Sequence, residues 1–305
     1  MIVVCGEALI DMIHNGDGTQ RAAPGGGPFN TARALARLGV PTAFLGRLSD
    51  DAFGRELAGL LTADGVNLDL ASIGHENTTI AIADVDSEGF AEYEFLVQGT
   101  SAPNLTIDAL PERLGPDVNA LHLGTLGLVL EPLASTLVEL LRQEHDGRLV
   151  MLDPNIRTGL IPESEYRERL REVISQSTIV KASESDVAWL YPGLDMETAA
   201  AQMLGDGVRL VVITLGARGA LGVHRDFSLS VRAPEVHVVD TIGAGDAFGA
   251  ALLAWLHDHG AIGTQLSLER DELKAALDYA CLAAALTCAR AGADPPRKSE
   301  MDGTK

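Results

Sequence analysis

Positive charge is scarce in this chain of 305 residues. Against 43 aspartates and glutamates stand only 23 lysines and arginines, which gives a formal net charge of −20. A protein that binds a nucleic-acid backbone needs a basic face, and an anionic membrane surface attracts clustered basic residues. We therefore expect neither partner. A phosphorylated ligand stays open, because backbone amide dipoles and a metal ion can attract phosphate locally.

Cysteine is also rare, and Cys5, Cys281 and Cys288 form no CxxC pair. Such an odd, sparse set argues against a disulfide framework and against a structural zinc site. No apolar run approaches the roughly 18 residues of a membrane span. The opening segment MIVVCGEALIDMI has no basic residue, and Glu7 and Asp11 interrupt it, so we interpret it as a core strand rather than a signal peptide. We expect a reducing, cytoplasmic setting.

Apolar segments of strand length alternate with segments of helical periodicity along most of the chain. Expected strands cover residues 1–10, 42–48, 120–127, 148–155, 177–183 and 209–216, and expected helices cover 30–39, 51–65, 133–145, 165–176, 196–207 and most of 243–290. This alternation predicts a mainly parallel sheet covered on both faces. With 46% hydrophobic residues the chain can bury a large core. We predict one α/β domain over residues 1–305, a three-layer α/β/α sandwich.

Two stretches depart from this pattern. Residues 12–24 are polar and rich in glycine, and residues 77–100 show strand alternation around a turn-like cluster at 86–89. We interpret both as inserts that form a small β-flap, a lid over the site, although a pair of ordinary edge strands would give the same pattern. The polar tail, residues 295–305, is expected to fray.

The strongest local signal is DTIGAGDAF at residues 240–248, which leads into an apolar helix. Gly243 and Gly245 allow a tight turn whose N–H groups point one way, and the amino end of the helix adds its positive dipole. Together they form a cradle for a phosphoryl group. Asp246 beside this cradle can accept a proton from an attacking hydroxyl. The alternative is that Asp246 merely caps the helix.

A second signal is PGGGPFN at residues 24–30, which opens another helix. The glycines let a ligand approach the backbone closely, and Asn30 offers both a donor and an acceptor to sugar hydroxyls. A loop followed by a capping Asn explains the same residues equally well. The spacing does not match the dinucleotide-binding GxGxxG motif, so a Rossmann dehydrogenase is disfavoured.

Other motifs fail. Only four lysines occur and none follows a glycine, so the chain has no Walker A loop. The triplet at 224–226 (HRD) lacks the remaining protein-kinase signatures and is attributed to chance. We interpret His122, on an expected strand, as a packed core histidine rather than a base.

These motifs together resemble the ribokinase-like (PfkB-type) family of carbohydrate kinases. The resemblance covers nearly the whole chain and rests on residues 25–39 (GGGPFNTARALARLG), 46–54 (GRLSDDAFG) and 240–253 (DTIGAGDAFGAALL). The two outer motifs, in this order and separated by about 215 residues, are highly specific. Residues 153–157 (DPNIR), 181–186 (KASESD) and 214–219 (TLGARG) resemble the fructokinase branch in particular.

The resemblance implies a role for each matching residue. Asp246 would be the catalytic base, and Gly243, Ala244 and Gly245 the anion hole for the transferring phosphoryl group. The implied sugar-binding residues are Asp11, Gly26, Gly27, Asn30, Gln98, Asp153, Asn155 and Arg157. The implied ATP-binding residues are Lys181, Ser183, Thr214, Gly216, Gly219 and Cys281, the last within an adenine-lining segment at 279–290.

The resemblance also implies ions. Asp186 would contact Mg²⁺ through water, and Asp240, Ile242 and Gly292 would form a loop for a monovalent cation such as K⁺. The family's Asn-x-x-Glu motif appears here as Ser183-x-x-Asp186, which keeps a carboxylate one methylene shorter. The flap segment near Phe95 lacks the arginine that fructokinases often carry, and the cation loop ends in Gly-Ala-Asp-Pro.

The leading hypothesis is an ATP-dependent sugar kinase that acts on fructose. Ribokinase and 2-keto-3-deoxygluconate kinase are the alternatives. The second is compatible with Arg157, which can meet the carboxylate of a sugar acid, although a structural salt bridge would explain Arg157 equally well. A phosphosugar kinase would use additional arginines, for which Arg21, Arg33 and Arg47 are candidates. A nucleoside kinase is disfavoured because the flap has few aromatic residues. From another class, a retired sugar-binding or regulatory protein could keep the same scaffold. An exposed flap face is also a surface through which a homodimer can form.

Overall fold

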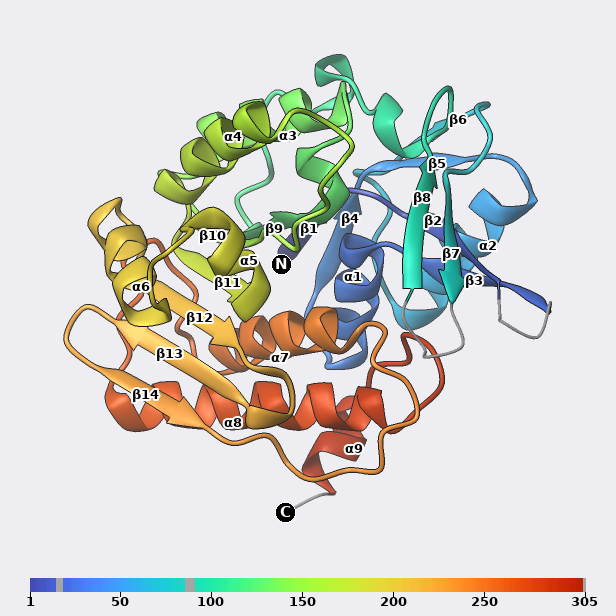
Figure 1. Ribbon diagram of the computed structural model, residues 1–305. Helices are drawn as coiled ribbons and strands as arrows, with labels where there is room; N and C mark the ends of the chain where they lie inside the picture. Colours follow the sequence, from blue (N-terminus) through green and yellow to red (C-terminus); the bar gives the residue numbers. More distant parts are fainter. Residues whose placement is uncertain (15–18, 86–90, 304–305) are drawn as a thin grey trace.

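The computed structural model describes residues 1–14, 19–85 and 91–303. Its main sheet has eight strands in the order β14-β13-β12-β11-β10-β9-β1-β4 (Figure 1). The parallel strands are β4 (Thr42–Leu45), β1 (Ile2–Cys5), β9 (Ala120–Gly124), β10 (Leu149–Asp153), β11 (Ile179–Ser183) and β12 (Leu210–Thr214). An antiparallel pair, β13 (Ala220–His224) and β14 (Ser228–Val231), extends one edge.

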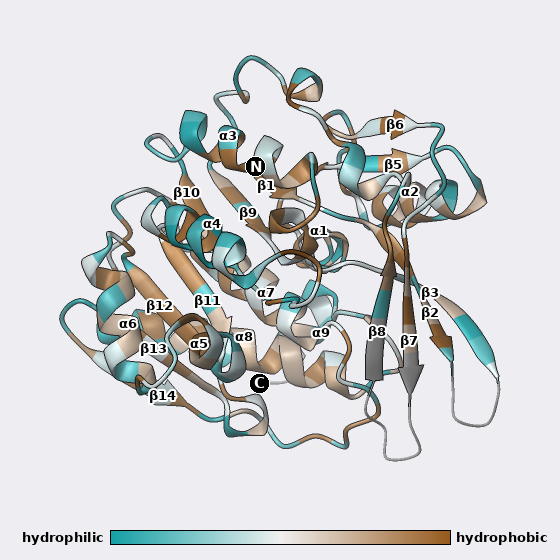
Figure 2. Ribbon diagram, turned by 45° about the horizontal axis from the view of Figure 1, so that its top comes forward, coloured by the Kyte–Doolittle hydropathy of each residue, from teal (hydrophilic) through white to brown (hydrophobic). Residues whose placement is uncertain are grey.

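Alternate residues of the central strands pack into two hydrophobic layers. In β1, Ile2 and Val4 face one layer while Val3 and Cys5 face the other, and each is at most 1% exposed. A parallel strand buried on both faces needs apolar residues at every position, which explains the continuous apolar runs that are brown in Figure 2.

Two groups of helices cover these faces. The first layer is covered by α1 (Gly27–Arg37), α2 (Ala52–Asp64), α7 (Ala244–Asp258) and α8 (Arg270–Cys288). The second is covered by α3 (Leu133–Glu144), α4 (Glu163–Ser175), α5 (Glu184–Leu190) and α6 (Met196–Gly205). The arrangement confirms the predicted α/β fold with helices on both sides of a mainly parallel sheet. Within the described ranges, no helix is long and apolar enough to cross a membrane.

Several elements differ from expectation. The strand predicted over residues 42–48 is divided, because β4 ends at Leu45 and β5 (Arg47–Ser49) pairs with β6 (Ser72–Gly74) in a separate sheet. The polar tail was expected to fray, but it contains a short helix, α9 (Lys298–Asp302). The side chain of Met301 explains this difference, since it is 2% exposed and packs into the first hydrophobic layer.

A second sheet of four strands stands beside the main one (Figure 1). Its order is β3 (Gln20–Gly25), β2 (Leu9–His14), β7 (Ile80–Val85) and β8 (Ala91–Leu96). In the described part of the chain these strands pair with one another and not with the main sheet. The turn expected at 86–89, and Phe90 next to it, lie outside the described residues.

The base of the β7–β8 hairpin is tied to α2 by Asp51. As the N-cap of α2, this carboxylate accepts a hydrogen bond from the Gly54 N–H at 2.7 Å. It also accepts bonds from both the N–H and the hydroxyl of Thr78, at 2.7 and 2.6 Å. The hydroxyls of Thr79 and Thr100 join the two ends of the hairpin at 2.8 Å. One side chain therefore caps a helix and anchors the second sheet.

We predict that Asp51→Ala lowers the free energy of unfolding by about 2–3 kcal/mol, since it removes a cap and two further charge-assisted bonds. Asp195→Ala is the matched control, because Asp195 caps α6 through groups of that helix's own first turn, chiefly the Thr198 N–H. That variant should cost only about 1 kcal/mol. Urea denaturation measures both values, and equal losses would contradict the anchoring role.

Candidate active site

The carboxyl ends of the parallel strands open into a cavity of about 360 Å³. It is bordered by residues just beyond the ends of β1 and β9. The last residues of β10, β11 and β12 border it as well. The second sheet adds Leu9, Asp11 and Phe95 from another side, and the amino end of α7 closes a third. This edge of an open α/β sheet is where such folds bind ligands.

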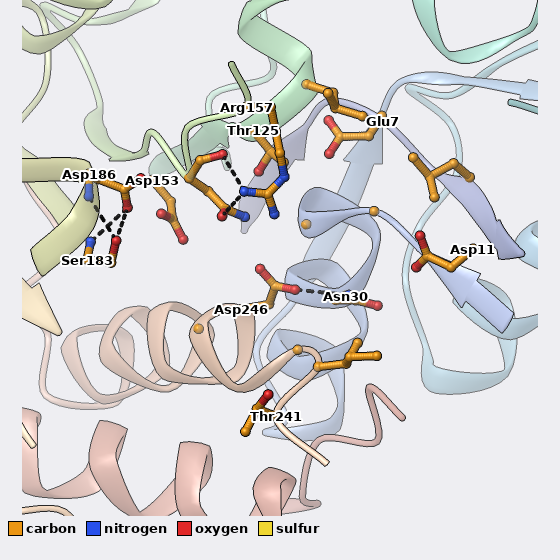
Figure 3. Close-up of a pocket in the computed structure, with 18 of the residues that line it drawn as sticks. Glu7, Asp11, Asn30, Thr125, Asp153, Arg157, Ser183, Asp186, Thr241 and Asp246 are labelled. Carbon is orange, nitrogen blue, oxygen red and sulfur yellow. Dashed lines mark hydrogen bonds between the residues drawn. The ribbon is translucent and has the colours of Figure 1, made fainter. Parts of the chain in front are cut away.

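Asp246 lies in the first turn of α7 and points into the cavity (Figure 3). Its Oδ2 accepts a hydrogen bond from Asn30 Nδ2, on α1, at 2.9 Å. The N-cap position belongs to Gly243, so the carboxylate faces α1 and does not cap its own helix. Burial raises the pKa of Asp246 to about 6, although the Asn30 hydrogen bond and the charges of Lys181 and Arg157 lower it. The group is therefore a base that is ionised at neutral pH.

The turn before α7 requires its glycine. Gly243 has a φ of 76°, in the left-handed region, and a Cβ placed there would lie 2.7 Å from the Cβ of Ala293. The first amides of the 15-residue helix have no partner within it. Gly243 and Gly245 border the cavity, so this amino end is presented to whatever anion binds beside Asp246.

A buried ion pair supports the floor of the site. Lys181 Nζ, on β11, donates to Asp153 Oδ2, on β10, at 2.5 Å, and both side chains are about 5% exposed or less. The ammonium lies 3.3 Å from the position that a Cβ on Gly245 would occupy. A positive charge is thus held directly under the turn that leads into α7.

The carboxylate of Asp186 accepts hydrogen bonds from neighbouring backbone N–H groups. Its Oδ2 accepts bonds from the Ser183 N–H and hydroxyl at 2.8 and 2.6 Å, which completes the capping box of α5. Its Oδ1 accepts a bond from the Ile156 N–H at 2.9 Å. The carboxylate therefore holds the segment that carries Asn155 and Arg157 against α5.

Arg157 brings the second cation to the cavity. Its guanidinium donates to Asn155 Oδ1 at 2.9 Å, and Asn155 has a φ of 36°, which is uncommon for a residue other than glycine. Figure 3 shows the guanidinium pointing into the cavity toward Asp246, with Glu7 and Thr125 beside it. Arg157 also lowers the pKa of Asp11, although burial dominates and raises that value to about 6.

Several lining residues escaped the sequence analysis as functional candidates, among them Thr125 and Glu7. Thr125 has a φ of 54°, and its hydroxyl lies 2.6 Å from the position of a Cβ on Gly27. Glu7 is fully buried, and its Oε2 accepts a bond from the Gly127 N–H at 2.9 Å. Their position in the sequence could have identified them, because each closely follows the carboxyl end of a parallel strand, where such folds bind ligands.

Most of the expected site residues do meet at this cavity. They are Asp11, Gly26, Gly27, Asn30, Asp153, Asn155, Arg157, Lys181, Ser183, Asp186, Thr214, Ile242, Gly243, Gly245 and Asp246. Ala244 is the first residue of α7, directly between the two glycines of the turn. Gly216 begins a single 3₁₀ turn just beyond Thr214 and Gly219 follows it, both outside the cavity lining.

Other expected residues lie elsewhere. Gln98 is exposed in the turn after β8 and does not border the cavity. Cys281 was expected to contact the nucleotide, but it is 3% exposed inside the hydrophobic layer under α8, because this position faces inward on the helix. Asp240 lies behind the turn, and its two oxygens accept bonds from the N–H groups of Ile242 and Gly292 at 3.0 and 2.8 Å.

The expectation for His122 is confirmed. Its side chain is 2% exposed, and neither ring nitrogen has a hydrogen-bond partner among the described residues. Burial, with the charge of Lys181, lowers its pKa to about 3, so the imidazole is a neutral packing group.

A family model described as "pfkB family carbohydrate kinase" matches residues 1–300. Among similar proteins, a fructokinase from Rhizobium leguminosarum bv. trifolii is 42% identical over 261 residues, covering 84% of this chain and 79% of the relative. Fructokinase-1 from Oryza sativa subsp. japonica is 32% identical and covers 100% of this chain and 97% of its own.

Solved structures agree with this. A fructokinase with bound ATP from Xylella fastidiosa superposes with a TM-score of 0.92 at 25% identity, covering 99% of this chain and 97% of that one. A fructokinase from Vibrio cholerae O395, in its form with fructose, ADP and a calcium ion, has a TM-score of 0.86 at 27% identity over the same shares.

The buried carboxyl of Glu7 makes stability depend on pH. Burial raises the pKa of Glu7 from 4.5 to about 8. The nearby charge of Asp246 also raises it, while the hydrogen bond from the Gly127 N–H and the charge of Arg157 lower it. Burial and, among other charges, that of Glu7 raise the pKa of Tyr166. The folded state therefore binds a proton that the unfolded chain has already released. The contribution of protonated Glu7 to the free energy of unfolding is fully present below pH 4.5 and is lost as the pH rises through about 8.

We predict that Glu7→Gln removes this loss. Relative to wild type, the variant should gain up to ~1.4 kcal/mol of unfolding free energy per pH unit between about pH 5 and 8. The gap should then stay constant above that range. Denaturation curves measured from pH 5 to 9 give the difference, in which the other titrating groups cancel. A gap that does not change with pH would show that Glu7 is ionised in the folded protein.

Proposed function

The chain belongs to the pfkB family of carbohydrate kinases and is a sugar kinase, and we propose that it transfers the γ-phosphoryl group of ATP to a hydroxyl of fructose. The observation that carries the proposal is the placement of Asp246. This half-buried carboxylate stands at the amino end of α7, beside the 243–245 turn, and is held by Asn30 from the helix that opens with the three glycines. Base, anion cradle and sugar-binding loop converge on one cavity.

The proposed reaction uses each part in turn. Asp246 takes the proton from the attacking hydroxyl, whose oxygen bonds to the γ-phosphorus while the bond to the β–γ bridging oxygen breaks and ADP departs. The amides at the amino end of α7 balance the charge on the transferring group. Lys181, under Gly245, adds a positive charge on the same side. The protein contributes positioning and electrostatics, since phosphoryl transfer needs little covalent help.

Fructose is proposed as the acceptor because the similar proteins are named fructokinases and one of the similar structures contains fructose. Asp11, Asn30 and Arg157 supply hydrogen-bonding groups for its hydroxyls at one end of the cavity. A second phosphate on the acceptor is disfavoured. Of the arginines considered for it, Arg33 pairs with Asp64 and Arg47 with Glu76, and neither lines the cavity.

The second sheet is proposed to act as a lid. It supplies Leu9, Asp11 and Phe95 to the cavity from outside the main sheet. A sheet in this place can exclude water from the reacting phosphate and so limit hydrolysis of ATP.

The residues present fit the proposed Mg²⁺. Within the described part of the chain, no group of three or more His, Cys, Asp and Glu side chains could hold a metal alone, so the ion is expected to arrive with the nucleotide. Asp153 Oδ1 is a buried carboxylate oxygen at the cavity without a hydrogen-bond partner among the described residues, and Asp186 lies nearby. Such oxygens suit this ion directly or through water. When bound, Mg²⁺ would neutralise charge on the β- and γ-phosphates.

A monovalent cation, K⁺, is proposed beside the 243–245 turn. Asp240 joins Ile242 to Gly292 through its two carboxylate oxygens, so two loops of the chain face one another there. A carboxylate and backbone carbonyls in such a place are ligands for a hard cation.

The test is ADP production from MgATP with K⁺ present, across fructose, ribose, 2-keto-3-deoxygluconate, a nucleoside and fructose 1-phosphate. We expect strong turnover with fructose, and Asp246→Asn should lower it by at least ~100-fold while the fold stays intact. Asp258→Asn, at the far end of α7, is the matched control and should keep full turnover. Wild-type turnover in Asp246→Asn would refute the base, and turnover confined to another acceptor would refute fructose.

The raised pKa of the base predicts a pH dependence. Asp246 must be ionised to take the proton, so kcat/KM for fructose should fall as the pH drops below about 6. Asp11, with a pKa also near 6, should steepen the decline if its ionised form binds the sugar. In Asp11→Asn the decline should flatten to one tenfold loss per pH unit. A profile that stays level down to pH 5 would contradict the assignment of Asp246.

A further inference from the structure

Two arginines at the carboxyl half of α1 share one buried carboxylate. Arg33 Nε donates to Asp64 Oδ2 at 2.8 Å, and Arg37 Nε donates to Asp64 Oδ1 at 2.9 Å. The Asp64 side chain, at the end of α2, is 4% exposed, and the arginines are 10% and 11% exposed. Charge-assisted bonds of this kind, shielded from water, fix the end of α1 against α2.

Arg37 reaches further than Arg33. Its NH1 donates to Asp294 Oδ1 at 2.6 Å and to the carbonyl oxygen of Pro295 at 2.8 Å. Both acceptors belong to the loop between α8 and α9. A single guanidinium therefore ties this loop to α1 through one ionic and one backbone contact, whereas Arg33 makes no described bond to the loop.

The same loop forms the back of the turn that precedes α7. Ala293 packs so closely behind Gly243 that any side chain at Gly243 would meet it at 2.7 Å. One residue earlier, the Gly292 N–H donates to Asp240 at 2.8 Å, and Asp240 in turn holds the Ile242 N–H at 3.0 Å. The loop thus contacts the turn at Gly243 and, through Asp240, just before it.

We propose that Arg37 is a positioning residue for phosphoryl transfer, which braces the 292–295 loop behind the 243–245 turn and so fixes the anion cradle at the amino end of α7. The inference rests on the proposed kinase function. It assigns a role to a side chain that lies outside the cavity and touches no substrate. The effect passes from Arg37 to Asp294, through Ala293, to Gly243.

Helix α1 connects the Arg37 contact to the rest of the site. The amino end of this 11-residue helix brings Gly27 and Asn30 to the cavity, and Asn30 holds Asp246. Its carboxyl end holds the loop that backs the cradle. One helix therefore sets the sugar-binding residues, the base and the cradle relative to one another, and small displacements among such groups cost large factors in rate.

The experiment compares Arg37→Met with Arg33→Met in the full chain. Both variants remove one bond to Asp64, but only Arg37→Met releases the loop. We expect Arg37→Met to lower kcat/KM for MgATP by about 10-fold, while Arg33→Met stays close to wild type. Asp294→Asn, which keeps the Arg37–Asp64 pair, should lie between them.

Hydrogen exchange followed by mass spectrometry supplies a readout independent of turnover. In Arg37→Met, the amides of residues 239–246 and 290–296 should exchange faster than in wild type, and in Arg33→Met they should not. Equal effects of the two variants on rate and exchange would overturn the proposal, since they would reflect only the loss of the Asp64 pair. Faster exchange without any kinase activity in wild type would keep the brace but refute the proposed function.

Discussion

The site depends on holding several carboxyl groups in one buried cavity with few cations to balance them. The ionisable side chains that line it in the described chain are Glu7, Asp11, Asp153, Asp186 and Asp246, with Lys181 and Arg157. Burial disfavours the charged forms of Glu7, Asp11, Asp153 and Asp246 and raises their pKa values. The pKa of Glu7 rises to about 8 and that of Asp246 to about 6. Glu7 is then largely protonated at neutral pH, which reduces the negative charge of the cavity, while most of Asp246 stays ionised.

The amino end of α7 and the ammonium of Lys181 also offset the negative charge of the cavity. The dipole at the amino end of α7 and the ammonium of Lys181 lie on the same side of the cavity, so an anion bound there would be stabilised although the chain carries a net charge of −20. The overall field of the protein thus says little about its ligand, because fixed local dipoles act at much shorter range.

The sequence predicted the fold and much of the site, because both are encoded locally. Continuous apolar runs marked the strands buried on two faces, and Gly243 marked the turn before α7, because residues other than glycine rarely adopt its φ of 76°. The structure places two of the expected site residues away from the cavity. Cys281 lies in the segment expected to line the adenine pocket, yet its side chain faces the core. Gln98 follows β8, and it is exposed beyond the cavity.

From the sequence alone came the α/β class, the candidate base at Asp246 and the glycine-rich loops, since neighbours within a few residues decide turns, strands and helix starts. Only the tertiary structure decided that Asn30 meets Asp246 across 216 positions and that Arg37 meets Asp294 across 257. It alone also decided that Glu7 is buried and Thr125 stands beside Gly27. Such contacts arise from how strands and helices pack in space, and the same residue types occur at many positions where packing leaves them exposed and unconnected.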